Sequence, residues 1–187
     1  AEGMLLCNFN QLWKVDPEVF SVWMRLLRDA ADAHLWLLRL PSSAEAHMRR
    51  HAEATHGSDI ASRIHFSERG EWRTHLLVKA MANLSLDNPV FNSHTSGVDV
   101  LWSGVPLLTL PRETMSSRVA ASLIFAVTSP VTVARDLEDY YLLGKLLAGS
   151  PGAARRLHAV REQLRTDRMH AKLFDTRRLV GELERGL

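Results

Sequence analysis

The sequence has little of several features that mark particular classes of protein. Cys7 is the only cysteine among 187 residues, so an internal disulfide is impossible. No apolar run reaches the ~18 residues that cross a bilayer, so we expect a soluble chain without a membrane partner. Lys and Arg number 23 against 21 Asp and Glu, and a net charge of +2 does not indicate nucleic acid as a partner.

Several ligand-binding motifs are also missing. The chain contains no Gly-x-Gly-x-x-Gly, no P-loop, no His-Glu-x-x-His and no paired cysteines, which argues against dinucleotide, P-loop and zinc sites. It has no Asp-x-Asp pair either, so a divalent metal that clamps a diphosphate is not indicated. We therefore predict no cofactor and no metal site.

What the sequence does contain is a regular alternation of short apolar runs with longer stretches of helical period. This pattern predicts an α/β fold, a Rossmann-like parallel sheet with helices on both faces. The expected strands are 4–9, 34–40, 63–67, 83–87 and 106–110, and the expected helices are 17–30, 43–56, 71–81, 96–103 and 115–126.

The last third of the chain is helical in period, over 137–148, 153–166 and 176–187. We expect a single domain over 1–187, with an α/β core at 1–134 and a helical C-terminal part at 135–187. The chain begins almost directly in an apolar run, which is typical of a segment cut from a longer protein.

Ligands of such sheets bind outside the carboxyl ends of the strands, where the strand order reverses. The loops that follow the expected strands should therefore meet at one edge. These loops are 10–14, 68–75, 88–96 and 111–117.

One of these loops runs straight into a helix and suggests an anion site. Thr95 or Ser96 can cap that helix, and Gly97 can let a ligand approach the backbone. The free N–H groups of the first turn would then hold a phosphate. The alternative is an ordinary capped helix in which Asp99 complements the dipole.

Five ordered motifs resemble the C-terminal catalytic lobe of O-GlcNAc transferases, over about 7–184. They are Cys-Asn-Phe-Asn-Gln-Leu-Trp-Lys-Val-Asp-Pro at 7–17, Leu-Trp-Leu-Leu-Arg at 35–39, His-Thr-Ser-Gly-Val-Asp-Val-Leu-Trp at 94–102, Pro-x-Glu-Thr-x-x-Ser-Arg-Val-Ala-Ala-Ser at 111–122, and Leu-Phe-Asp-Thr at 173–176.

The resemblance implies one lobe of a GT-B glycosyltransferase that moves N-acetylglucosamine from UDP-GlcNAc to Ser or Thr of proteins. In that family the transfer inverts the anomeric carbon and needs no metal. An N-terminal catalytic lobe and tetratricopeptide repeats, both absent from this sequence, would be its partners. The family also implies a cytoplasmic or nuclear location. This chain would be the donor-binding lobe, inactive by itself.

Residue roles at the donor diphosphate follow from the matched motifs. Gln11 and Lys14 stand where the family contacts the diphosphate, and Lys14 would act catalytically by neutralising the charge of the departing UDP. His94, Thr95 and Ser96 would hold the phosphates through side chains and helix-start amides, in place of a metal.

At the uridine end the resemblance is weaker. Asp99 matches the carboxylate that bonds the ribose, and His75 matches the histidine that lies against uracil. Where the family resembles Val-Ala-Pro-Lys-x-x-His, residues 69–75 are Arg-Gly-Glu-Trp-Arg-Thr-His, so Trp72 replaces the lysine expected on ribose. Gly70 can still offer backbone groups to the base.

Two alternatives stay open. A non-catalytic nucleotide-binding or interaction module derived from this fold would have lost donor chemistry, as Trp72 would permit. A related transferase would use another nucleotide sugar, such as GDP-fucose, as SPINDLY proteins do.

Overall fold

A five-stranded parallel sheet forms the centre of the computed structural model, which describes residues 3–186 except the side chains of residues 72, 73 and 75. The strand order is β3-β2-β1-β4-β5, so the direction of winding reverses between β1 and β4. That reversal creates the crevice in which doubly wound sheets bind ligands. The strands are β1 (Met4–Asn8), β2 (Ala33–Leu38), β3 (Ile64–Ser67), β4 (Leu84–Leu86) and β5 (Leu107–Leu108).

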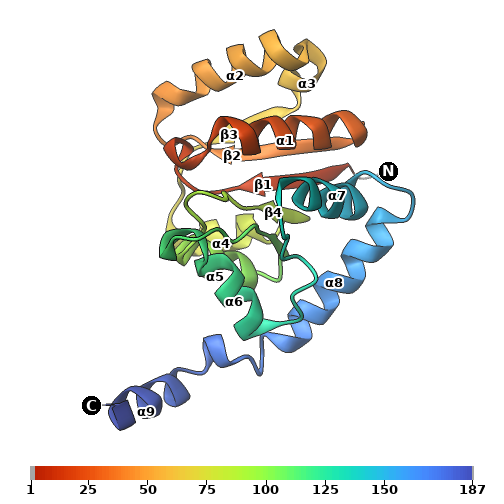
Figure 1. Ribbon diagram of the computed structural model, residues 1–187. Coiled ribbons are helices and arrows are strands. Elements are labelled where there is room, and N and C mark those ends of the chain that lie inside the picture. Colours follow the sequence, from red (N-terminus) through yellow and green to blue (C-terminus); the bar gives the residue numbers. More distant parts are fainter. Residues whose placement is uncertain (1–2, 187) are drawn as a thin grey trace.

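Helices cover both faces of the sheet (Figure 1). On β1, Leu6 belongs to one apolar cluster and the next residue, Cys7, to the other, because successive side chains of a strand point to opposite faces. The first cluster lies under α1 (Pro17–Asp29), α2 (Ser42–His56), α3 (Ser58–Ser62) and α7 (Leu137–Ala148). The second contains residues of α5 (Thr95–Trp102) and α6 (Val119–Val127), with α4 (Trp72–Lys79) packed beside α5.

Local signals fix the ends of α1. Asp16 accepts a hydrogen bond from the Val19 backbone N–H at 2.9 Å, and Pro17 occupies the first helical position. At the other end, the Arg63 guanidinium donates to the carbonyls of Leu27 at 2.6 Å and Ala30 at 2.9 Å. Arg63 is thus a buried cation that satisfies carbonyls with no partner inside the helix.

The predicted fold class is confirmed, but two elements differ from expectation. The helix expected at 115–126 is a short 3₁₀ turn, Met115–Ser117, followed by α6. The loop before α5 intervenes, because Asn92 donates its backbone N–H to Ser116 and its side chain accepts from the Ala120 backbone N–H. The short helix α3, between α2 and β3, was not expected.

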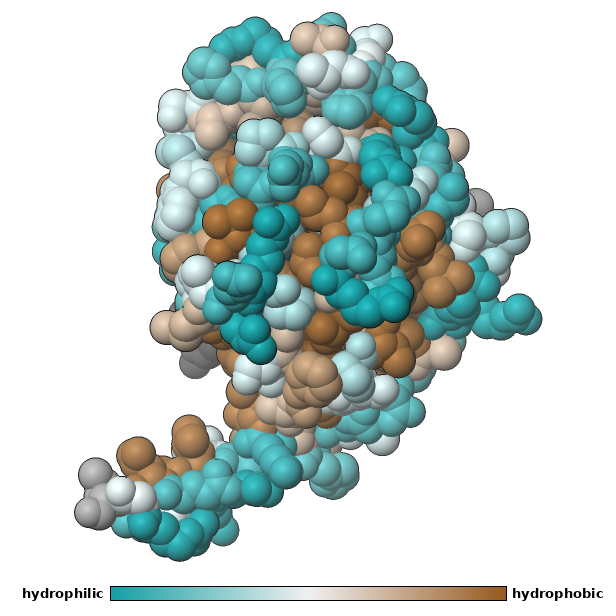
Figure 2. Space-filling view, in the orientation of Figure 1, coloured by the Kyte–Doolittle hydropathy of each residue, from teal (hydrophilic) through white to brown (hydrophobic). Residues whose placement is uncertain are grey.

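The C-terminal part divides between the body of the molecule and its periphery. α7 packs against α1, and α8 (Ala153–Asp167) adds a buried leucine to each apolar cluster. α9 (Thr176–Gly186) follows the 3₁₀ turn Lys172–Phe174 and projects from the body with apolar side chains exposed, Leu179 and Leu183 among them (Figures 1 and 2). None of the described helices has the length and apolar character that crossing a membrane requires.

Candidate nucleotide-binding site

A cavity of about 650 Å³ lies at the carboxyl ends of β1 and β4, where the strand order reverses. Six of the eight residues predicted for the donor site line it: Gln11, Lys14, His94, Thr95, Ser96 and Asp99. The other lining residues are Phe9, Asn10, Trp13, Leu38, Leu40, Arg69, Lys79 and Phe91. Segments far apart in the sequence therefore form one site, as the topology predicts.

Asn10 ties the loop after β1 to the start of α5. Its side-chain amide donates to Ser93 Oγ at 2.7 Å, and its carbonyl oxygen accepts from Ser96 Oγ at 2.7 Å. Its backbone N–H donates to Asn8 Oδ1 at 2.9 Å. Because Asn10 is only 5% exposed, these bonds are shielded from water and hold the two walls in fixed relation.

The buried carboxylate of Asp87 holds the loop between β4 and α5 in place through hydrogen bonds. Asp87 Oδ1 accepts from the Ser93 backbone N–H at 2.6 Å, and Oδ2 accepts from Thr109 Oγ1 at 2.7 Å. Burial raises the pKa of Asp87, and the hydrogen bonds from Thr109 and Ser93 oppose that rise. The carboxyl group thus has a structural role, and it is not among the residues that line this cavity.

The Lys14 ammonium packs against the face of an aromatic ring. Its Nζ is 4.0 Å from the centroid of the Phe91 ring, and that ring stacks on His94 at 5.1 Å between centroids. Partial burial lowers the pKa of Lys14, while the charge of Asp87 raises it. No carboxylate forms an ion pair with Lys14 in the described structure, so its ammonium is available to an anion in the cavity.

The start of α5 differs in detail from the prediction. The helix begins at Thr95, and neither Thr95 nor Ser96 caps it, because His94 takes the cap position without a side-chain bond. Gly97 does not admit a ligand. It is buried, and a Cβ there would lie 3.1 Å from Leu123 Cδ1, so the glycine allows α5 to pack closely against α6.

Lys79 is a site residue that the sequence analysis missed. Its side chain is 1% exposed, and Nζ lies 2.7 Å from Asp99 Oδ2. Asp99 is 43% exposed and reaches the cavity. No local signal in the sequence marked it, because Leu76 and Val78 are half-buried and Leu77 is exposed, so the burial of Lys79 is known only from the structure.

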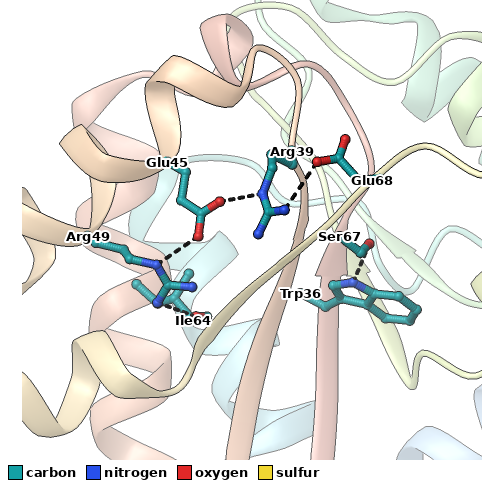
Figure 3. A network of polar contacts seen from close by, with 7 residues as sticks. All are labelled: Trp36, Arg39, Glu45, Arg49, Ile64, Ser67 and Glu68. Carbon is teal, nitrogen blue, oxygen red and sulfur yellow. Dashed lines mark hydrogen bonds and ion pairs between the residues drawn. The ribbon is translucent and has the colours of Figure 1, made fainter.

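Charged groups fix the loop after β3 (Figure 3). Arg39, at the end of β2, contacts Glu45 of α2 at 2.5 Å and Glu68 at 3.1 Å, and its backbone N–H donates to the Ser67 carbonyl. The residue after Glu68 is Arg69, which lines the cavity and forms no ion pair with another described residue.

The two predicted contacts to uridine, His75 and Gly70, stay predictions. The side chain of His75, like that of Trp72, lies outside the described residues. Gly70 follows Arg69 but is not one of the residues lining the cavity. The fourth predicted loop, 111–117, lies beside this site and lines a second cavity with Arg135 and Asp136.

Among the side chains that the structure describes, no three His, Cys, Asp or Glu residues lie together as a metal site requires. The Lys and Arg side chains that line the cavity are Lys14, Arg69 and Lys79.

Comparison with known proteins identifies the family. The sequence model of glycosyl transferase family 41 matches residues 1–183. The chain belongs to glycosyl transferase family 41. The predicted resemblance to O-GlcNAc transferases is thereby confirmed.

Two curated relatives of this family 41 chain carry the same activity in their names. The UDP-N-acetylglucosamine–peptide N-acetylglucosaminyltransferase of Caenorhabditis elegans is 34% identical over 98% of this chain, and this chain covers 16% of its length. A protein of Arabidopsis thaliana named probable UDP-N-acetylglucosamine–peptide N-acetylglucosaminyltransferase SEC is 38% identical over 98% of this chain, with 18% of its length covered. The family 41 chain thus spans about a sixth of the length of these relatives.

Solved structures establish the fold. A mutant O-GlcNAc transferase of Thermobaculum terrenum superposes over 100% of this chain and 35% of its own, with a TM-score of 0.87 and 24% identity. The pneumococcal O-GlcNAc transferase GtfA, in complex with UDP and GlcNAc, covers 99% of this chain and 35% of its own, with a TM-score of 0.65 and 11% identity. The family 41 chain therefore has the predicted architecture of a GT-B lobe.

Proposed function

We propose that this chain is the donor-binding lobe of a protein O-GlcNAc transferase and that its cavity takes UDP-GlcNAc. The observation that carries the proposal is the gathering of Lys14, the α5 start and Asp99 at the strand-order reversal. The names of the relatives suggest the donor, since both name UDP-N-acetylglucosamine.

The wall formed by Lys14 and α5 suits a diphosphate. Helix N-termini bind phosphate because their first N–H groups lack acceptors within the helix. In α5 the N–H groups of Gly97 and Val98 both donate to the His94 carbonyl, which leaves those of Thr95 and Ser96 for a ligand. Together with the Lys14 ammonium, these donors would hold a diphosphate without a metal ion.

The reaction we propose is an in-line displacement at the anomeric carbon. A Ser or Thr hydroxyl oxygen forms the new bond to that carbon, the bond to the β-phosphate oxygen breaks, and the configuration inverts. UDP leaves with the electron pair, and Lys14 with the α5 amides stabilises its negative charge. The hydroxyl proton passes to a base outside this chain.

Calorimetric titration with UDP in EDTA tests the donor site. The wild-type chain should bind, and Lys14→Ala should weaken binding about 10- to 100-fold, as loss of a charged contact implies. The matched control is Lys172→Ala, because Lys172 is an exposed lysine that does not line this cavity. No binding at millimolar UDP would refute the proposal, and tighter binding of GDP than of UDP would favour the alternative donor.

A transfer assay tests the need for the rest of the protein. With labelled UDP-GlcNAc and a Ser/Thr-rich peptide, the isolated chain should transfer no sugar, because the base and acceptor contacts lie elsewhere. Label in the peptide would show that 187 residues suffice for catalysis.

A further inference from the structure

Lys79 stands out among the cavity residues because its side chain is nearly inaccessible. It is 1% exposed, whereas its partner Asp99 is 43% exposed. The two residues come from neighbouring helices, Lys79 from the last turn of α4 and Asp99 from the middle of α5. Lys79 Nζ donates to Asp99 Oδ2 at 2.7 Å, the length of a charge-assisted hydrogen bond.

The ion pair uses only one oxygen of the carboxylate. Asp99 Oδ1 has no hydrogen-bond donor among the described residues, while the side chain as a whole lines the cavity. The carboxylate therefore presents one fixed acceptor oxygen to whatever occupies this end of the site. Such an oxygen accepts from any N–H or O–H donor, and the ribose of a nucleotide offers its hydroxyl groups as donors.

Contacts other than the Lys79–Asp99 pair also hold α4 in place. Ser103 Oγ of the α5 end donates to the Leu76 carbonyl of α4 at 3.1 Å. Arg161 of α8 donates to the Ala80 carbonyl at 3.3 Å and so caps α4. The specific effect of the Lys79 side chain is thus on the direction of the Asp99 carboxylate.

We infer that Lys79 is a positioning residue that aims Asp99 at the ribose hydroxyls of the donor and makes the site select ribonucleotides over deoxyribonucleotides. The inference rests on the proposed function, because it assumes a nucleoside diphosphate in the cavity. Lys79 acts only through Asp99. Its loss should therefore weaken the contribution of the sugar hydroxyls while contacts to the diphosphate remain.

The experiment compares the affinities of the chain for UDP, 2′-deoxy-UDP and 3′-deoxy-UDP by calorimetry. In the wild type, removing at least one hydroxyl should weaken binding tenfold or more, as loss of a hydrogen bond to a charged group implies. In Lys79→Met that ratio should fall below about threefold, with the affinity for the deoxy ligand nearly unchanged. Lys79→Arg, which keeps a cation, should restore part of the ratio.

A matched control separates positioning from general loosening of the two helices. Ser103→Ala removes the bond from the Ser103 hydroxyl to the Leu76 carbonyl of α4 and should keep the wild-type ratio. The inference is overturned if Lys79→Met keeps the ratio, if Ser103→Ala loses it equally, or if the wild type binds UDP and both deoxy ligands alike. In each of these cases UDP still binds and the proposed function stands, whereas failure of the wild type to bind UDP removes both.

A second measurement uses the wild-type chain and does not depend on whether Lys79→Met folds. The ¹⁵Nζ resonance of the Lys79 ammonium, assigned with Lys79→Arg, should shift when UDP is added to the wild type. At saturation the hydroxyl-deficient ligand that binds weakly should shift it by less than half as much. Equal shifts from all three ligands would contradict the inference.

Discussion

Asn10→Ala should reduce both the stability of the chain and its affinity for UDP. The substitution deletes two hydrogen bonds, to Ser93 and from Ser96, each 2.7 Å long. A typical bond contributes about 1 kcal/mol net, and the buried Ser93 hydroxyl left without its donor adds about 1 kcal/mol or more. We therefore expect a loss of about 3 kcal/mol in the free energy of unfolding.

The same substitution separates the loop that carries Lys14 from the start of α5, and we expect about tenfold weaker UDP binding. The matched control is Asn83→Ala. Asn83 accepts one bond, from the Leu5 backbone N–H at 2.7 Å, at the amino end of the sheet far from the cavity loops. It should cost about 1 kcal/mol and leave UDP affinity unchanged.

Urea denaturation followed by circular dichroism measures the first quantity, and calorimetric titration measures the second. The reasoning is wrong if Asn10→Ala loses no more stability than Asn83→Ala. It is also wrong if the variant binds UDP as tightly as the wild type, since the clamp would then have no part in forming the site.

Three further predictions concern the scaffold of the site. Gly97→Ala should destabilise the chain by about 1–3 kcal/mol in urea melts, because the added Cβ meets Leu123 at 3.1 Å; a gain of about 1 kcal/mol, as helix propensity alone implies, would contradict this packing. Arg63→Met should reduce the free energy of unfolding by about 2–4 kcal/mol in the same assay, since the Leu27 carbonyl loses its side-chain donor and the Ala30 carbonyl keeps only the Ala33 N–H; a change below about 0.5 kcal/mol would contradict this role. Burial raises the pKa of Asp87 in the folded chain above its unfolded value, so its contribution to stability is complete below about pH 4 and is lost as pH rises through the folded-state pKa. Asp87→Asn should remove that decline in a series of melts from pH 4 to 8, and parallel curves for variant and wild type would refute the assignment.

Much of the architecture follows from local sequence. Short apolar runs predict the five strands, and the helical period predicts a helix from residue 17, where α1 begins. The interrupted helix at 115–118 was not predictable in this way, because the interruption depends on Asn92, more than twenty residues earlier in the chain. Residues 115–126 have a helical period throughout, and a contact distant in sequence overrides it.

The site shows the same division between motif and tertiary contact. Gln11, Lys14 and Asp99 were predicted because they lie in recognisable motifs, and the structure places them on one cavity. Phe91 was missed although it lies in a predicted loop, because its role as a platform for Lys14 depends on how two loops meet. Gly97 was assigned to ligand approach, yet the tertiary structure uses it for helix packing.

By itself, the sequence determined the alternation of strands and helices, the likeness to its family and most of the residues on the cavity wall. These properties are local, since hydrophobic period, turn chemistry and motif order are written along the chain. Only the tertiary structure decided that Lys79 is buried against Asp99, that Asn10 joins two walls and that Arg69 enters the site. Such pairings depend on strand order and on the packing of α4 against α5, and a burial or a hydrogen bond between distant residues exists only once the chain has folded.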